Sequence, residues 1–315
     1  MKNRINLNGS IVGVSSGVTW AVNTVIIGGI VSNNILGVNQ NAILYMPFIV
    51  SFLNDALSFI YVTIYNLFFK SVRGLFNIVK SKSGIIIAIG AILAGPIGMG
   101  CYALSMKYIS PGYAAAISST YPGISAIIAW LFFKEKLKKG TVISVLLTIV
   151  GAIILGYTSG NSEILSKNLI GLALVMITAI CWALESIVCS IGIKNNYNYN
   201  EILNIRQGAS AFFTGIIIFQ FLGDVDRTVM VNGIGYIVIA SFVGTISYML
   251  YYKSIENIGA SKATCLNTSY AMWAVIIQCI YSQYISLNII IGSTLIFISI
   301  CIIYKEDRKE GVKAI

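Results

Sequence analysis

Ten long apolar segments succeed one another along this chain, and they limit its fold more than any other feature. Each holds about 20 residues, the length that a helix needs to cross the hydrocarbon core of a bilayer. The 315-residue chain is 57% hydrophobic and only 10% charged, whereas about a quarter of the residues in soluble domains are charged. We therefore expect an all-α membrane protein with ten transmembrane helices, at residues 10–31, 42–69, 84–106, 111–133, 140–158, 169–191, 202–222, 233–252, 260–282 and 286–304.

Two parts of the chain are similar to each other. Residues 9–26 (GSIVGVSSGVTWAVNTVI) align without a gap on residues 171–188 (GLALVMITAICWALESIV), which places Trp20 on Trp182. A second alignment places residues 102–122 on residues 251–271 and pairs Tyr121 with Tyr270. We therefore expect one five-helix repeat at residues 1–160 and another at residues 161–315. Because five is odd, the second repeat would insert upside down relative to the first, as in many secondary transporters.

The loops differ in their basic residues. Most of the 21 lysines and arginines fall in alternate loops, and only Lys107, Lys167 and Arg227 fall in the opposite loops. The positive-inside rule therefore predicts that both termini are cytoplasmic. The net charge of +10 is interpreted as an orientation signal and a match to anionic lipid headgroups, and no nucleic-acid-binding patch is expected.

The cysteines and polar motifs give no sign of catalysis. All six cysteines fall in apolar segments without pair-like spacing, which indicates buried thiols rather than disulfides or a metal site. The sequence has no recognisable nucleophile–base pair, metal-binding cluster or phosphate-binding loop. We expect neither a metal nor a cofactor, and an enzyme is disfavoured.

Four aromatic residues stand near the middle of their predicted spans, away from the interfaces where tryptophan and tyrosine usually anchor a helix. They are Trp20, Tyr121, Tyr270 and Trp273. They either pack between helices or form an aromatic box around a ligand. Tyr270 and Trp273 are three residues apart and therefore share a helix face.

Apart from Lys262 near the start of its span, three charged residues fall inside predicted spans, where a charge is costly unless it is paired, hydrated or neutralised. Asp55 and Arg206 either pair with each other or, for Arg206, reach towards the cytoplasmic surface. Glu185 has no obvious basic partner in its own span, so a cationic ligand is its expected partner. Trp182, three residues earlier, lies on the same helix face as Glu185.

Two prolines also lie inside predicted spans. Pro96 and Pro122 are surrounded or followed by glycines, and each removes a backbone hydrogen bond. They either kink helices that line a site or shape static helices. A site at the midplane, flanked by two inverted repeats, would be exposed to each side in turn by rocking of one repeat against the other.

Aromatic rings around one carboxylate suit a quaternary ammonium ion. Such an ion has no N–H group to donate, but the negative faces of tryptophan and tyrosine rings attract its methyl groups. Each desolvated contact of this kind contributes about 1–2 kcal/mol, so several rings together offset much of the cost of dehydration. An anionic or sugar substrate would require arginines or amides at the midplane, and these are scarce in the predicted spans.

Further stretches carry a resemblance: residues 95–99 (GPIGM), 121–125 (YPGIS), 185–187 (ESI), 205–207 (IRQ), 246–248 (ISY) and 262–273 (KATCLNTSYAMW). Together they are similar to the LicB-type bacterial choline transporters of the EamA type, within the drug/metabolite transporter superfamily. Asn54 and Asp55 stand where this resemblance leads us to expect His-Asp, and the chain has no histidine, which puts a proton role at that pair in doubt. The resemblance implies a choline site formed by Trp20, Tyr121, Glu185, Tyr248, Tyr251, Asn267, Tyr270 and Trp273.

The resulting hypothesis is a multi-pass bacterial plasma-membrane protein that imports choline or a close quaternary ammonium ion. A cation of charge +1 gains about 2.3 kcal/mol per 100 mV on entering a negative interior, so uptake needs no coupling ion. The alternative on the same fold is an exporter of hydrophobic cations, drugs or amino acids. A non-transporting membrane subunit is a further alternative. The expected partners are a small-molecule cation and membrane lipids, and the chain is expected to be a monomer or homodimer.

Overall fold

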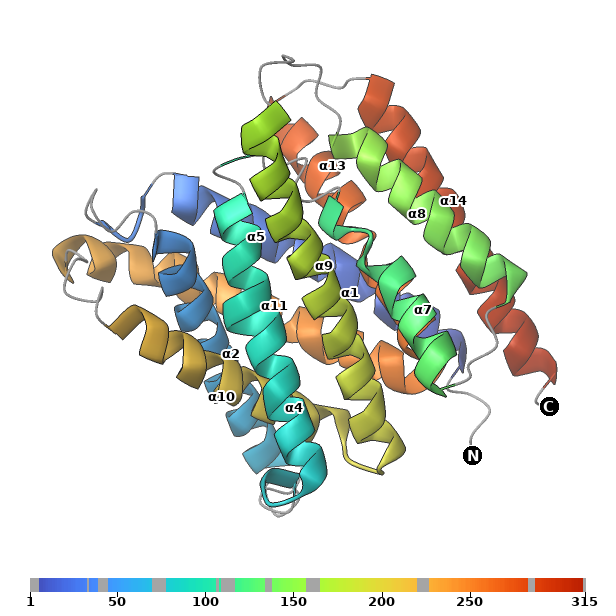
Figure 1. Cartoon of the computed structure of the whole chain (residues 1–315), viewed down its shortest axis with the longest axis horizontal. Helices are drawn as coiled ribbons and strands as arrows, with labels where there is room; N and C mark the ends of the chain where they lie inside the picture. The colour runs from blue at the N-terminus through green and yellow to red at the C-terminus, as the bar shows by residue number, and fades with distance from the viewer. Residues whose placement is uncertain are drawn as a thin grey trace.

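The computed structural model describes residues 6–32, 34–38, 45–69, 78–105, 108, 117–133, 138–156, 165–219, 227–282 and 287–313. Within these ranges every regular element is a helix (Figure 1). The helices are α1 Asn6–Ser32, α2 Met46–Phe69, α4 Lys82–Ile92, η2 Leu93–Met99, α5 Gly100–Ser105, α7 Tyr121–Phe133, α8 Lys139–Gly156, α9 Leu165–Lys194, α10 Tyr199–Ile218, α11 Arg227–Ile258, α12 Ala260–Asn267, α13 Tyr270–Ser282 and α14 Leu287–Lys313.

Each of the ten predicted spans contains at least one of these helices. Among the described residues, six stretches are long and apolar enough to cross a membrane: Gly9–Ile30, Met46–Phe69, Lys82–Tyr102, Leu169–Lys194, Gly233–Ile258 and Leu287–Glu306. α7 and α8 are shorter apolar helices. The chain is therefore built as a multi-pass membrane protein, while the ten-span topology and the cytoplasmic side of the termini stay predictions.

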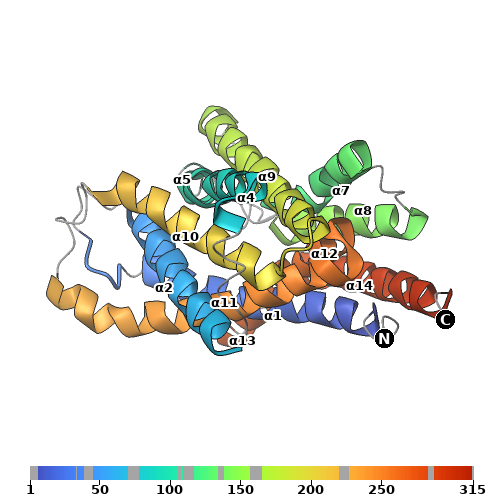
Figure 2. The ribbon, with the colours of Figure 1, turned by 90° about the horizontal axis from the view of Figure 1, so that it is seen from below.

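Helices from the two halves of the chain pack against one another in matched pairs. α1, which opens the first half, packs along α11, and α9, which opens the second half, packs along α4, η2 and α5. α2 packs along α10, and α8 packs along α14 at one edge of the molecule (Figure 1). The start of α1 and the end of α14 lie at the same end of the bundle (Figures 1 and 2). The halves are interleaved rather than separate.

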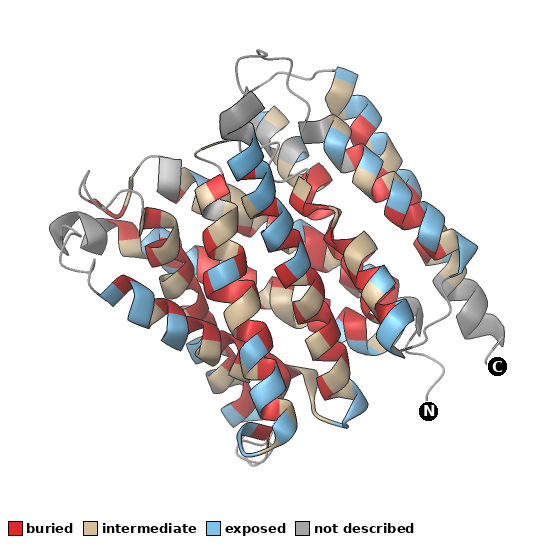
Figure 3. Ribbon diagram, viewed as in Figure 1, coloured by how far each residue is buried: buried red, intermediate tan, exposed pale blue. Residues whose placement is uncertain are grey.

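The helices form two sides with a centre between them. Seen from below, α4, α5, α7 and α9 lie on one side, α1, α11 and α13 lie on the other, and α12 is central (Figure 2). Exposed residues are spread over the outward faces of the helices (Figure 3). Many of them are large and apolar, such as Phe68 at 79% and Phe132 at 76% exposure, which suits contact with lipid rather than water.

Two predicted spans are interrupted at matching positions. α12 ends at Asn267, residues 268–269 form a turn, and α13 begins at Tyr270. Residues 117–118 are likewise helical, residues 119–120 form a turn, and α7 begins at Tyr121. The internal alignment pairs Tyr121 with Tyr270, so both breaks occupy the same position of the two copies. The prediction of two continuous helices was wrong here, because a two-residue turn of small polar residues leaves hydropathy unchanged.

The two prolines have different effects. Pro96 lies inside η2, a π-helical stretch between α4 and α5. Proline has no N–H group to donate, and its ring clashes with the carbonyl group four residues earlier. The wider π-helical turn accommodates the missing hydrogen bond and the ring. Pro122 is the second residue of α7, where backbone N–H groups have no partner within the helix. Pro122 therefore marks the start of a helix after a break rather than a kink within one.

Candidate functional site

A pocket lies where helices from both halves of the chain meet. It contains about 450 Å³ of space between protein atoms, part of which is open to solvent. Its walls come from α7 and α9 on one side of the molecule, from α1, α11 and α13 on the other, and from the central α12 (Figure 2). The lining residues are Trp20, Tyr121, Trp182, Glu185, Ser247, Tyr248, Tyr251, Asn267 and Tyr270.

All but one of the residues predicted to bind a ligand line this pocket. The exception is Trp273, which packs in an apolar cluster with Trp20 and Tyr270 and so stands behind the wall. Two lining residues, Trp182 and Ser247, were not among the predicted binding residues. Trp182 had a signal, because it occupies the repeat position of Trp20 and shares a helix face with Glu185. Ser247 had none, since serine is common in transmembrane helices.

Aromatic rings support one another around the pocket. The rings of Trp20 and Tyr248 are 5.1 Å apart at an interplanar angle of 70°. Those of Tyr121 and Trp182 are 6.1 Å apart at 88°. The ring of Tyr102 also packs against Trp182, with a centroid distance of 5.3 Å and a tilt of 49°. Edge-to-face pairs of this kind hold ring orientations, because the positive edge of one ring meets the negative face of the other. The pocket therefore presents rings in fixed orientations.

A chain of hydrogen bonds fixes the interrupted helices. The hydroxyl of Tyr121 donates to Asn267 Oδ1 at 2.9 Å, and Asn267 Nδ2 donates to Ser16 Oγ at 3.0 Å. The hydroxyl of Ser247 donates to the carbonyl oxygen of Ser16 at 2.7 Å. These bonds connect α7, α12, α1 and α11. Both ends of the Asn267 amide are used within the protein, so Asn267 acts as a support for the pocket wall.

Glu185 has a basic partner in the protein, contrary to the prediction that a ligand would supply it. Arg206 Nε on α10 donates to Glu185 Oε1 at 2.7 Å, and Arg206 Nη2 lies 3.5 Å from Oε2. The hydroxyl of Tyr252 donates to the same Oε1 at 3.1 Å. Both charged side chains are buried, with residue exposures of 7% for Glu185 and 2% for Arg206. The prediction failed because it considered only partners within the same helix.

Arg206 also contacts Tyr248 and Asp55. Its Nη2 donates to the Tyr248 hydroxyl at 3.1 Å, and its Cζ lies 4.6 Å from the centroid of that ring. Its Nη1 donates to Gln207 Oε1 at 2.6 Å and lies 3.5 Å from Asp55 Oδ1. Ser210 donates to the other Asp55 oxygen at 2.5 Å. The structure thus contains the Asp55–Arg206 pair that the sequence offered as one possibility.

The group formed by Asp55, Glu185 and Arg206 carries one net negative charge when both carboxylates are ionised. We call it the charge triad. At the repeat position of Glu185, the first copy has Asn23, whose Nδ2 donates to the carbonyl oxygen of Ala240 at 2.7 Å. The first copy therefore has a neutral contact between helices where the second copy has a charge. With both carboxylates ionised, the triad places excess negative charge beside an aromatic pocket.

The model of the EamA-like transporter family matches this chain at residues 7–157 and again at residues 169–305. The chain is 29% identical to protein LicB of Haemophilus influenzae over 190 residues, which cover 60% of this chain and 64% of that protein. It is 25% identical to an uncharacterized transporter of Clostridium kluyveri over 236 residues, covering 71% and 73% of the two chains. A crystal structure of a protein at 13% identity has the same fold, with a TM-score of 0.72, and the match covers 96% of this chain and 98% of that one.

The two family matches together cover most of the chain, and each falls in one of the similar halves. The family and the relatives' names indicate a transporter rather than an enzyme. The six apolar helical stretches in the described part of the chain agree with a multi-pass membrane protein. The chain belongs to the EamA-like transporter family.

Proposed function

We propose that this protein imports choline or a closely related quaternary ammonium ion across the bacterial plasma membrane. The observation that carries the proposal is the pocket itself, which tryptophan and tyrosine rings line together with Glu185. Aromatic faces attract the methyl groups of a cation that has no N–H to donate. The excess negative charge of the triad favours a positively charged ligand over a neutral or anionic one.

The packing of the halves supports transport by alternating access. The first helix of each half packs along the third span of the other half, and the pocket takes residues from both halves. Two five-helix repeats of opposite orientation, at residues 1–160 and 161–315, account for this exchange. Rocking of one set of helices against the other would expose the pocket first to one side of the membrane and then to the other. The matching breaks before Tyr121 and Tyr270 give the lining helices places to bend.

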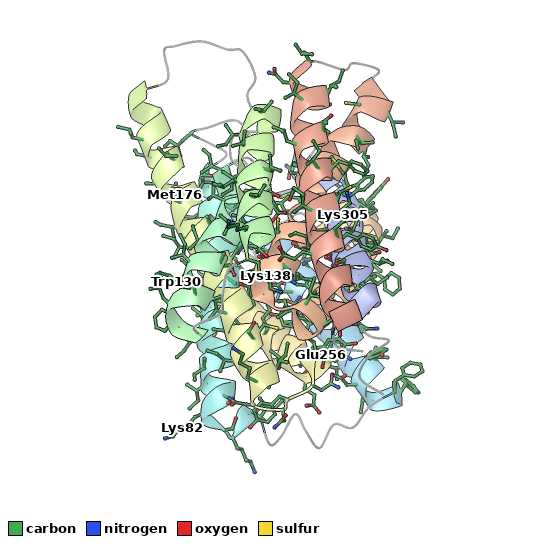
Figure 4. The ribbon with its side chains drawn as sticks, turned by 90° about the vertical axis from the view of Figure 1, so that its right-hand side faces the viewer. Lys82, Trp130, Lys138, Met176, Glu256 and Lys305 are labelled. Carbon is green, nitrogen blue, oxygen red and sulfur yellow. The ribbon has the colours of Figure 1, made fainter. Side chains whose placement is uncertain are left out.

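Uptake into proteoliposomes tests the proposal. Radiolabelled choline should accumulate when a potassium gradient and valinomycin impose an inside-negative potential, without any sodium or proton gradient. An ion of charge +1 would reach roughly fiftyfold accumulation at 100 mV. Trp20→Ala should reduce this uptake strongly. Trp130→Ala is the matched control, because Trp130 is 55% exposed and lies at the outer edge of the bundle (Figure 4).

Competition defines the ligand. Betaine and carnitine add a carboxylate that Glu185 repels, and ethanolamine lacks the methyl groups that the rings attract, so all three should compete poorly with choline. If a well-folded preparation binds no choline, the assignment of choline as the substrate is wrong. Strong binding of bulky hydrophobic cations with poor competition by choline would instead favour the exporter on the same fold.

A further inference from the structure

One guanidinium group occupies the two pocket groups best suited to hold a bound cation. Arg206 contacts the carboxylate of Glu185 at 2.7 Å and lies 4.6 Å from the centroid of the Tyr248 ring. A carboxylate and an aromatic face are the features that stabilise an ammonium ion in a desolvated site. Glu185 and Tyr248 line the pocket, whereas Arg206 reaches them from behind the wall. Arg206 and a substrate cation therefore require the same two partners.

A second carboxylate lies within reach of Arg206. Its Nη1 is 3.5 Å from Asp55 Oδ1, a distance longer than the 2.7–2.9 Å that is usual for charge-assisted hydrogen bonds. The Ser210 hydroxyl holds the other oxygen of Asp55 in place. A shift of the guanidinium by roughly 1 Å towards Asp55 would shorten this contact to a full hydrogen bond, and packed interfaces accommodate shifts of this size.

We propose that Arg206 and the substrate cation alternate at Glu185 and Tyr248. The inference depends on the proposed function, because it requires a cation in the pocket. Arrival of the cation moves Arg206 towards Asp55, and return of Arg206 to Glu185 expels the cation. Two positive charges facing one buried carboxylate would repel each other strongly. With Arg206 on Asp55 and the substrate on Glu185, two carboxylates balance two cations.

This arrangement gives Arg206 a role in release as well as in binding. A site with an unopposed carboxylate and several rings would hold its cation tightly and turn over slowly. Competition from Arg206 weakens binding and supplies a partner for Glu185 once the substrate leaves. Glu185 and Arg206 thus each have a partner of opposite charge at every stage, which avoids the large cost of an uncompensated charge in the membrane interior.

A charge-matched double variant tests this role. Arg206→Gln combined with Asp55→Asn removes one positive and one negative charge, keeps Glu185, and preserves the net charge of the triad. We expect the double variant to bind tetramethylammonium on the order of tenfold more tightly than the native protein, by titration calorimetry, and to exchange choline more slowly in counterflow. Equal or weaker binding with normal folding would overturn the inference and leave Arg206 as a group that only orients Glu185.

The outcomes separate this inference from the proposed function. If the native protein binds no quaternary ammonium ion, both are wrong. If the native protein binds and the double variant gains no affinity, only the alternation of Arg206 is wrong.

A second measurement does not depend on the double variant. In protein labelled with ¹⁵N at arginine Nε, the Arg206 signal, assigned by its loss in Arg206→Lys, should shift when tetramethylammonium saturates the native protein. The other arginines, Arg4, Arg73, Arg227 and Arg308, fall outside the predicted spans and serve as internal references. An unchanged Arg206 signal at saturation contradicts the alternation.

Discussion

The hydroxyl of Tyr121 donates a hydrogen bond of 2.9 Å to the side-chain oxygen of Asn267, and this bond joins the two halves of the chain at their interrupted helices. Tyr121→Phe keeps the ring but leaves the Asn267 oxygen without this donor. We expect the free energy of unfolding to fall by about 1–3 kcal/mol and choline affinity to fall severalfold, because the wall loses its support. Denaturation in detergent and calorimetric titration measure the two effects. Tyr236→Phe, at an exposed position on α11, should change neither.

Glu185→Gln should weaken choline binding more than Asp55→Asn does. Glu185 lines the pocket, whereas Asp55 contacts the site only through Arg206. The loss at Glu185 should be on the order of tenfold or more, since the variant removes the carboxylate that would face the cation in a desolvated site. Calorimetric titration of the two variants decides the order, and equal losses would remove the special role of Glu185. Glu306→Gln is the matched control, because Glu306 pairs with Lys262 and Thr141 away from the pocket.

Trp182→Ala should reduce choline affinity by about tenfold or more, since a desolvated cation–π contact contributes on the order of 2 kcal/mol. The chain has four tryptophans, of which Trp20 and Trp182 line the pocket. Choline should therefore change the tryptophan fluorescence of the native protein. Trp130→Ala should retain that change, and the double variant Trp20→Phe/Trp182→Phe should lose most of it. A full response in this double variant would place the cation elsewhere.

Gly17→Ala should damage the pocket although Gly17 does not line it. A Cβ atom at Gly17 would lie 2.9 Å from the carbonyl oxygen of Asn267 and still closer to the Ser269 hydroxyl, so α1 would move away from the break after α12. We expect a loss of about 1–3 kcal/mol in stability, as for other overpacked positions, and weaker choline binding. Gly28→Ala is the control on the same helix, because no heavy atom lies within 4 Å of its added Cβ. Similar thermal melting of the two variants would contradict this prediction.

The positions of the helices followed from the sequence because long apolar runs leave few other options. The pocket residues Trp20, Tyr121 and Tyr270 could also be predicted, since an aromatic residue in the middle of a span lies too deep to anchor the helix at the membrane interface. The Glu185–Arg206 pair could not be predicted from the sequence, although its members are only 21 residues apart. They lie on successive helices, and the rotation of each helix about its axis is set by packing against neighbours that hydropathy does not identify. The turns before Tyr121 and Tyr270 could not be predicted either, because two small polar residues leave the hydropathy of a span unchanged.

The charge triad has a consequence for the origin of such a site. In a symmetric dimer of identical half-length chains, every charge near the axis has a twin, so the charges around a central pocket add up to an even number. Here one half contributes Glu185 and Arg206 and the other contributes Asp55, which leaves an odd total of minus one. A fused chain, whose halves diverge independently, can reach an odd total with every carboxylate ionised, whereas twin carboxylates can do so only by sharing a proton. Fusion of the two halves therefore allows a site whose charge of minus one neutralises a monovalent cation completely.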